Sequence, residues 1–181
     1  MHIQTHILSG WCLGNLIPFT ARERAFCMLA ASLPDIDGLG MIAGGVEQHW
    51  YWDYHHKLAH NLLFGVVMSA ALALLSKNRW RAAAVYLGLF HLHLLADYFG
   101  SGPGWPIHYL WPFSDEQLMN WQAWNLFSWQ NLSTFAVLLL WTIGIMLFKR
   151  RTPLEAVMPS LDRQIVAMVR GRQKSRAMQA P

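Results

Sequence analysis

The sequence predicts an all-α membrane protein, a polytopic helical bundle of three to five membrane-associated helices. Hydrophobic residues make up 54% of its 181 positions and charged residues only 13%, against about 45–50% and about 25% in soluble globular domains. Uncharged stretches of nearly membrane-spanning length recur along the chain. This composition excludes a disordered or fibrous chain and an ordinary soluble protein with a charged surface.

The first apolar segments predict a helical hairpin. Residues 7–19 and 25–33 are apolar and flank the charged residues 22–24. At this length the two helices either span obliquely or enter the membrane only in part. Cys12 and Cys27 lie in these segments without CxxC spacing, so we expect them to pack between helices and to form neither a disulfide nor a zinc–thiolate site.

The longer apolar stretches predict the helices that cross the membrane. Residues 58–76 and 132–148 carry no charge and approach the ~20 apolar residues that span a bilayer. Residues 82–99 are similarly long and apolar but contain His93 and Asp97. Ionisable groups are costly within lipid, so their presence in this helix indicates a function.

Charge asymmetry predicts the orientation of the helices. Basic residues lie at alternate ends of successive helices, at Arg22, Arg24, Lys77, Arg79, Arg81 and 149–151. The opposite ends and loops carry Asp35, Asp37, Glu47, Asp53, Asp97, Asp115 and Glu116. Because basic residues favour the cytoplasmic side, the acidic face is expected to be periplasmic or extracellular in a bacterial inner membrane.

Two segments flank the last predicted span. Residues 98–131 are rich in Gly, Pro and Trp and predict an irregular loop over the outer face that leads into an interfacial helix.

Eight of the fourteen Lys and Arg residues lie from Lys149 onward. The sequence thus divides into a membrane-embedded domain over 1–150 and a basic cytoplasmic tail over 151–181. In the tail, residues 154–169 are expected to form a surface helix beside anionic lipid, followed by a flexible end. Nucleic acid is not expected as a partner, because the net charge of +4 belongs to this tail.

Two polar motifs precede the apolar stretch over residues 82–99. Asp35 and Asp37 form the turn PDID, where both carboxylates can face one site, although such a turn also serves as a helix cap or a solvated bend. His56 and His60 are four residues apart, on one face of a helix beginning there, which suits two imidazoles converging on a metal. Histidines at a membrane–water boundary are the alternative interpretation, and His55 is expected to point elsewhere.

His93 and Asp97 repeat the four-residue spacing on the next helix, with His91 on another face. His60 lies seventeen residues before Lys77 and His93 sixteen after it, so an antiparallel pair of helices brings them to similar depth. His6 lies sixteen residues before Arg22 and Asp35 thirteen after it, so a helical first hairpin brings both toward the same face.

These groups predict a metal centre with oxygen and nitrogen ligands but no thiolate, as zinc and manganese hydrolytic sites use. The candidate metal ligands are His6, Asp35, Asp37, His56, His60, His93 and Asp97. They suffice for two divalent metals, either zinc or manganese, with one carboxylate bridging the ions. Such ions lower the pKa of water and hold both oxygens in a displacement, and Asp35 or Asp37 is the candidate catalytic residue that moves a proton.

The ordered motifs resemble the YdjM-like family of inner-membrane proteins, described as metal-dependent hydrolases and in some members as LexA-regulated. The motifs are TH at 5–6, PDID at 34–37, HKLAH at 56–60, HLLAD at 93–97 and GWPIHYLWPFS from Gly104. The resemblance covers roughly the first 150 residues. This chain departs at Lys57, Ala59 and Asn61 from the family's usual HRGxTHS while keeping both histidines.

The order His, Asp, His, HxxxD is also similar to part of the pattern of zinc-dependent phospholipase C and single-strand nucleases. That resemblance implies phosphoester chemistry, with His93 and Asp97 binding one metal alongside Asp35 or Asp37 and a histidine from 56–60. It implies that Asp97 bridges to another metal near His6. The later HxxxE-like set for a third metal has no counterpart here, so two metals are expected.

The sequence therefore predicts a membrane-bound hydrolase that cleaves a phosphoester of a lipid or another amphiphile. His108, Trp105 and Trp111 are candidate substrate-binding residues, and an aromatic belt at the membrane surface is the alternative for them. A metal or proton transporter and a non-catalytic, metal-stapled membrane scaffold are the competing functions. The sequence contains no GxSxG elbow and no P-loop, which sets aside serine hydrolases and nucleotide triphosphatases.

Overall fold

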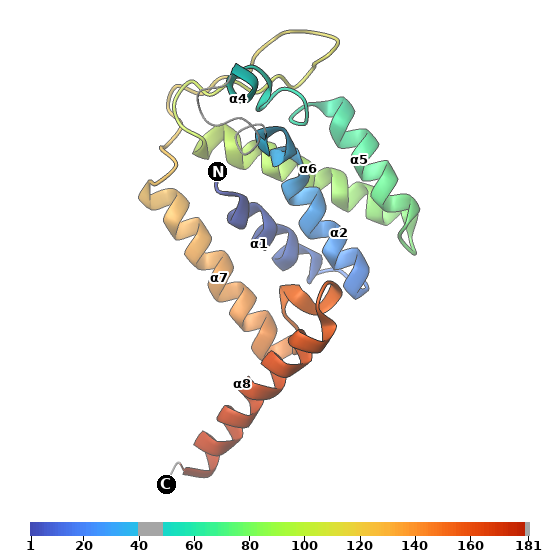
Figure 1. Ribbon diagram of the computed structural model, residues 1–181, viewed down its shortest axis with the longest axis vertical. Coiled ribbons are helices and arrows are strands. Elements are labelled where there is room, and N and C mark those ends of the chain that lie inside the picture. Colours follow the sequence, from blue (N-terminus) through green and yellow to red (C-terminus); the bar gives the residue numbers. More distant parts are fainter. Residues whose placement is uncertain (40–48, 180–181) are drawn as a thin grey trace.

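The computed structural model describes residues 1–39 and 49–179, and its regular structure within those ranges is helical (Figure 1). The elements are α1 (Ile3–Gly14), α2 (Ala21–Ser32), η1 (Leu33–Leu39), α4 (His49–Tyr54), α5 (Leu62–Leu74), α6 (Arg79–Gly100), α7 (Trp129–Lys149), η2 (Pro153–Ala156) and α8 (Pro159–Gln179). The described residues contain no β-strand, only an isolated bridge between Ile107 and Leu118. The all-α prediction is therefore confirmed, while Glu47 of the predicted acidic face lies outside the described residues.

Helices α1 and α2 form the predicted hairpin, and it packs closely. A Cβ atom added to Gly10 would lie 2.4 Å from the carbonyl oxygen of Cys27, so only glycine allows this approach. Thr20 and Glu23 form a capping box at the start of α2, which satisfies backbone groups that the helix leaves free. Residues 22–24 consequently lie inside the first turn of α2 and not between the helices. Cys12 and Cys27 are free and buried.

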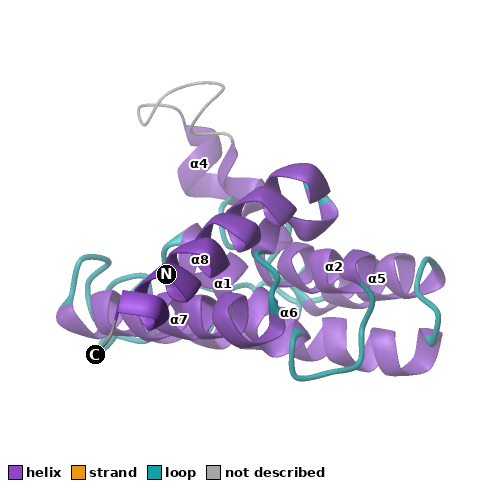
Figure 2. Ribbon diagram, turned by 90° about the horizontal axis from the view of Figure 1, so that it is seen from below, coloured by secondary structure: helices purple, strands orange, loops and turns teal. Residues whose placement is uncertain are grey.

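Helix α6 packs against both α2 and α5, while α7 packs against α1. Figure 1 shows α8 leading away from this bundle, and Figure 2 shows α4 standing to one side of it. The core between the helices is apolar and includes Phe90, Tyr86 and Ala30, all fully buried. The bundle therefore holds α1, α2 and the C-terminal half of α6 in fixed relative positions.

Two described helices, α6 and α7, are long and apolar enough to cross a bilayer, where the sequence predicted three to five membrane-associated helices. The prediction of a span over 58–76 is wrong in length, because α5 contains 13 residues and is about 20 Å long. Residues 55–61 form turns and bends instead of the first part of that helix. Those turns contribute to the polar site described below.

Basic residues gather at one end of the bundle, around the turn between α1 and α2. The Lys149 ammonium contacts the carbonyl oxygen of Asn15, and the backbone N–H of Lys77 donates to Glu23 Oε1 at 2.9 Å. Arg24 forms an ion pair with Glu155 of η2, which fastens the start of the tail to α2. Beyond it, the backbone is helical through Gln179, so the tail helix continues well past its predicted end at residue 169.

The segment between α6 and α7 is irregular, as predicted, and is tied to the opposite end of the bundle. Asn131 Nδ2 donates to the carbonyl oxygen of Gly100 at 2.8 Å, and Trp124 Nε1 donates to Asn131 Oδ1 at 2.8 Å. Helix α7 begins directly at Trp129, so no separate interfacial helix precedes it. These hydrogen bonds hold the end of α6 beside the start of α7.

Candidate metal centre

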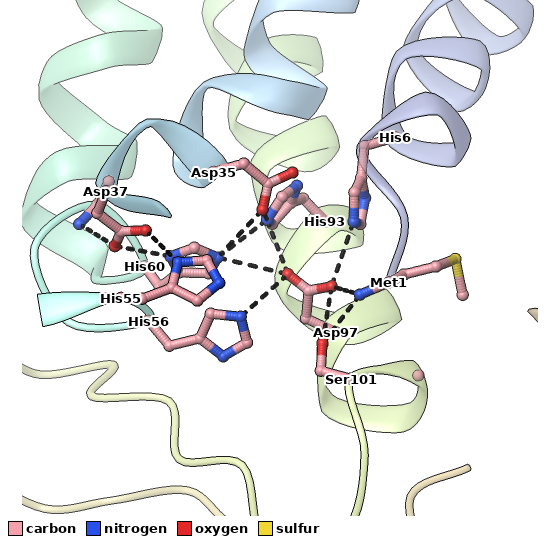
Figure 3. Close-up of polar contacts among 12 residues, drawn as sticks. Met1, His6, Asp35, Asp37, His55, His56, His60, His93, Asp97 and Ser101 are labelled. Carbon is pink, nitrogen blue, oxygen red and sulfur yellow. Dashed lines mark hydrogen bonds and ion pairs between the residues drawn. The ribbon is translucent and has the colours of Figure 1, made fainter. Parts of the chain in front are cut away.

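Figure 3 shows that the predicted ligands converge on one another, from the start of α1, η1, the 55–61 segment and the C-terminal half of α6. Two groups of potential ligand atoms form there, each with its atoms within 4.8 Å of one another. The first group is His6, Asp35, His93 and Asp97, and the second is His56, His60 and Asp97. Asp97 is common to both, so one carboxylate stands between the two groups.

Helix α6 supplies His93 and Asp97 from adjacent turns of one face. His93 Nε2 lies 2.9 Å from Asp97 Oδ2. On the other side of the ring, His93 Nδ1 lies 2.8 Å from the carbonyl oxygen of Ala31. A carbonyl only accepts, so Nδ1 carries the proton and Nε2 directs its lone pair into the site. Both side chains are almost completely buried.

Helix α1 and the 3-10 turn η1 supply His6 and Asp35. His6 Nε2 lies 3.2 Å from Asp97 Oδ1, and the His6 ring lies against that of His93, with ring centroids 3.9 Å apart. Asp35 Oδ1 lies 3.6 Å from His93 Nε2 and 4.0 Å from His60 Nε2. Asp35 Oδ2 is buried without a hydrogen-bond partner, although the side chain as a whole retains 14% exposure. Asp35 is therefore the ligand closest to the outside.

The 55–61 segment supplies His56 and His60, but not through the predicted helical face. His56 has a left-handed backbone with φ 65°, and α5 starts only after its N-cap, Asn61. The Asn61 side chain also donates to the carbonyl oxygens of Lys57 and Leu58. Its amide thus stabilises the turn that brings the two histidines together, at one of the positions where the chain departs from the family motif.

Asp37 belongs to neither ligand group. Its Oδ2 accepts from the backbone N–H of Ala59 and lies 3.0 Å from His60 Nδ1, while its Oδ1 lies 2.8 Å from His55 Nδ1. Because Asp37 faces His60 Nδ1, His60 Nε2 remains toward the shared carboxylate, 3.4 Å from Asp97 Oδ2. A carboxylate on the far nitrogen of a metal-binding histidine orients the ring and fixes its tautomer. The structure thus places Asp37 behind the ligands.

The sequence interpretation missed two residues at this site. His55 was expected to point elsewhere, yet it contacts Asp37 and its ring lies 4.4 Å from that of His56. Tyr51 of α4 stacks on His55 with ring centroids 4.7 Å apart. The His55–His56 doublet was the available signal. Nothing in the sequence pattern pointed to Tyr51, because α4 meets the site only through the tertiary fold.

Protonation in the 55–61 segment follows from these contacts. Burial favours neutral His60, but the nearby carboxylates of Asp37 and Asp97 outweigh burial and raise its pKa to about 9. Burial and the neighbouring His60 lower the pKa of His56 well below its usual value. Burial favours the neutral acid at Asp37, yet hydrogen bonds from His55 and His60 outweigh it and lower the pKa of Asp37. Two neighbouring histidines are therefore driven to opposite charge states.

Asp97 is the buried anion at the centre of the site. Its Oδ1 contacts the Met1 ammonium and accepts from Ser101 Oγ at 3.1 Å. Its Oδ2 faces the Nε2 atoms of His93, His60 and His56 at 2.9, 3.4 and 3.8 Å but has no hydrogen-bond partner. A buried carboxylate oxygen without a hydrogen bond, facing imidazole nitrogens, is suited to a divalent cation. The residues present therefore fit a metal ion.

The three candidate substrate-binding residues take different places. The Trp105 ring lies 5.5 Å from that of His56 and 5.9 Å from that of His55, so it packs beside one ligand of the second group. The His108 backbone N–H donates to the carbonyl oxygen of His56, while its ring contacts Gln117. Trp111 lines an apolar groove of about 220 Å³ beside the start of α5, and none of the ligands lines that groove.

The fold and the site define a helical protein with two apolar helices of membrane-spanning length and a buried histidine–aspartate centre at one end. The chain belongs to the YdjM inner membrane protein family, whose profile matches residues 1–171. The match extends past residue 150 into α8, so the family's sequence pattern includes part of the predicted tail. Neither the curated proteins nor the solved structures contain a significant match to the chain.

Proposed function

We propose that the chain is a membrane-bound hydrolase that holds two divalent metal ions, zinc or manganese, and cleaves a phosphoester of a lipid or another amphiphile. The observation that carries the proposal is the pair of ligand groups that share buried Asp97. Shared carboxylates of this kind bridge the ions of two-metal hydrolases.

His6, Asp35, His93 and Asp97 would hold one ion, and His56, His60 and Asp97 the other. The ions supply Lewis acidity and lower the pKa of water at the site. Asp35 suits proton transfer, because its Oδ1 faces the ligands while Oδ2 is without a hydrogen-bond partner. Asp37 orients His60 through Nδ1 and acts as a positioning residue.

The surroundings of the site support hydrolysis over the two competing functions. The second group provides three protein ligands, which leaves a coordination position for water or substrate, whereas structural sites are closed by four. A transporter needs polar groups along its path. The buried residues of α6 before His93 are instead Ala82, Tyr86, Leu89 and Phe90, so the buried histidine and carboxylate of that helix stay at one end.

The membrane orientation follows from charge. The basic end holds Lys149 against the α1–α2 turn and places Arg24 and Lys77 at the start of α2, and basic ends favour the cytoplasmic side. We therefore propose that the ligand end faces the periplasm or the cell exterior and that α8 lies at the cytoplasmic surface.

Metal content and activity of the detergent-purified protein test the proposal together. Wild type should contain about two zinc or manganese ions per chain by plasma mass spectrometry and should cleave bis(p-nitrophenyl) phosphate. Asp97→Asn should lose both ions and the activity, because each ligand group includes Asp97. His91→Gln is the matched control, since His91 shares α6 but bonds to Leu87 and Tyr109. Wild type that binds no metal after reconstitution would refute the proposal.

A further inference from the structure

Large aromatic side chains are exposed at two levels of the bundle. At the ligand end, Trp121, Phe127 and Trp129 are 74%, 77% and 73% exposed. At the basic end, Trp80 is 89% and Phe148 86% exposed. Aromatic residues at both ends of membrane-spanning helices lie at the two membrane–water interfaces. These side chains therefore mark two candidate boundaries.

The spacing of these aromatics matches a bilayer on both long helices. Trp80 and Phe99 of α6 are nineteen residues apart, as are Trp129 and Phe148 of α7. At ~1.5 Å per residue each pair spans about 28 Å, close to the ~30 Å of hydrocarbon in a bilayer. Between the levels, α7 exposes aliphatic residues such as Val137, which is the surface that lipid chains require.

The two helices share the level at the ligand end. Asn131 in the first turn of α7 accepts from Trp124 and donates to Gly100 at the end of α6. The backbone N–H of Trp124 also donates to the carbonyl oxygen of Phe99 at 2.9 Å. The boundary marked by Trp129 on α7 is therefore the boundary marked by Phe99 on α6.

The two ligands of α6 lie beneath this boundary. Asp97 precedes Phe99 by two residues, which places it about 3 Å below that level, and His93 lies about 9 Å below it. The phosphates of membrane lipids lie immediately outside the hydrocarbon boundary. A lipid in the adjacent leaflet thus carries its phosphoester close to the depth of Asp97.

We infer that the site cleaves the phosphoester of a membrane phospholipid taken from the leaflet at the ligand end, without the lipid leaving the bilayer. This inference rests on the proposed function and specifies its substrate class. The site suits such a substrate because His60, His93 and Asp97 are at most 2% exposed. A soluble phosphodiester would have to leave water to reach them, whereas a lipid phosphate is already close to the level of Asp97.

Depth measurement tests the bilayer position independently of activity. Nitroxide labels would be attached to Phe127→Cys, Val137→Cys and Phe148→Cys in vesicles of phosphatidylethanolamine and phosphatidylglycerol, with labelled wild type as the background for buried Cys12 and Cys27. Collision with oxygen and with a water-soluble nickel chelate should place the labels at 127 and 148 near the two boundaries and that at 137 near the bilayer centre. A label at 127 that contacts bulk water as freely as a soluble nitroxide would overturn the inference.

Substrate comparison separates this inference from the proposed function. The metal-loaded protein in the same vesicles should cleave their phospholipids at least tenfold faster than the deacylated glycerophosphodiesters of the same headgroups. Cleavage of bis(p-nitrophenyl) phosphate and of the deacylated diesters without cleavage of the lipids would overturn the lipid assignment and leave the hydrolase standing. No cleavage of any of them by protein with two bound metals would overturn both.

Discussion

Substitution of Asp37 by Asn tests whether this residue orients a metal ligand or binds metal itself. The carboxylate faces His60 Nδ1 at 3.0 Å and His55 Nδ1 at 2.8 Å. An asparagine keeps the size but offers one acceptor and one donor. If the amide NH₂ turns toward His60, that ring must move its proton to Nε2 and can no longer bind a metal through it.

Asp37→Asn is expected to weaken metal binding without abolishing it, because Asp37 acts through the ligand His60. Removal of such a partner weakens metal binding about 10–100-fold, or roughly 1.4–2.8 kcal/mol. Asp37→Asn should therefore bind zinc 10–100-fold more weakly in a competition titration against a chelating dye, and still reach full occupancy at high zinc. Asp53→Asn, at an exposed position of α4, is the control and should bind as wild type does. Unchanged affinity would contradict the positioning role, and complete loss of one ion would identify Asp37 as a direct ligand.

Three further predictions concern packing, protons and the tail. Gly10→Ala should lower the free energy of unfolding in detergent by about 1–3 kcal/mol, because its Cβ would meet the Cys27 carbonyl at 2.4 Å, whereas Gly88→Ala, with no atom within 4 Å, should not lower it. Zinc binding at pH 7 should release a proton from His60, because a pKa of about 9 keeps that residue charged without metal. The heat of zinc binding measured by calorimetry should therefore change with the ionisation enthalpy of the buffer. Heats that are the same in all buffers would contradict this prediction. Glu155→Gln removes the anionic partner of largely buried Arg24, at a cost on the order of 1–3 kcal/mol, and should speed tryptic cleavage after residues 149–151 roughly tenfold; an unchanged rate would mean that the pair does not hold the tail.

The spans and the site were accessible from the sequence to different degrees. Residues 82–99 and 132–148 were recognisable because long apolar stretches have few structural alternatives, and α6 and α7 contain both. Residues 58–76 look the same by composition, yet they give only the 13-residue α5. The hydrogen bonds of Asp37 to Ala59 and His60 hold the preceding segment in turns, and an interaction between distant residues leaves no periodic signal.

The same contrast applies to the site. Six of the seven predicted ligands gather into two groups that share Asp97, and the helical spacing of His93 and Asp97 was enough to foresee one contact. His56 and His60 also meet, but through a left-handed turn and not through the helical face that their spacing suggested. The part played by Asp37 could not be separated from that of Asp35, because two carboxylates in one turn are equivalent until their neighbours are known.

The sequence by itself determined that the chain is helical and apolar and that its imidazoles and carboxylates collect at the ends of helices, since hydropathy and charge are local properties. The tertiary structure decided which nitrogen of each histidine faces the centre, which aspartate supports the ligands from behind, and that Tyr51 and His55 cover them. Those choices depend on contacts between residues many positions apart, such as His6 and Asp97. Only the packing of α1, η1 and the 55–61 segment against α6 creates them.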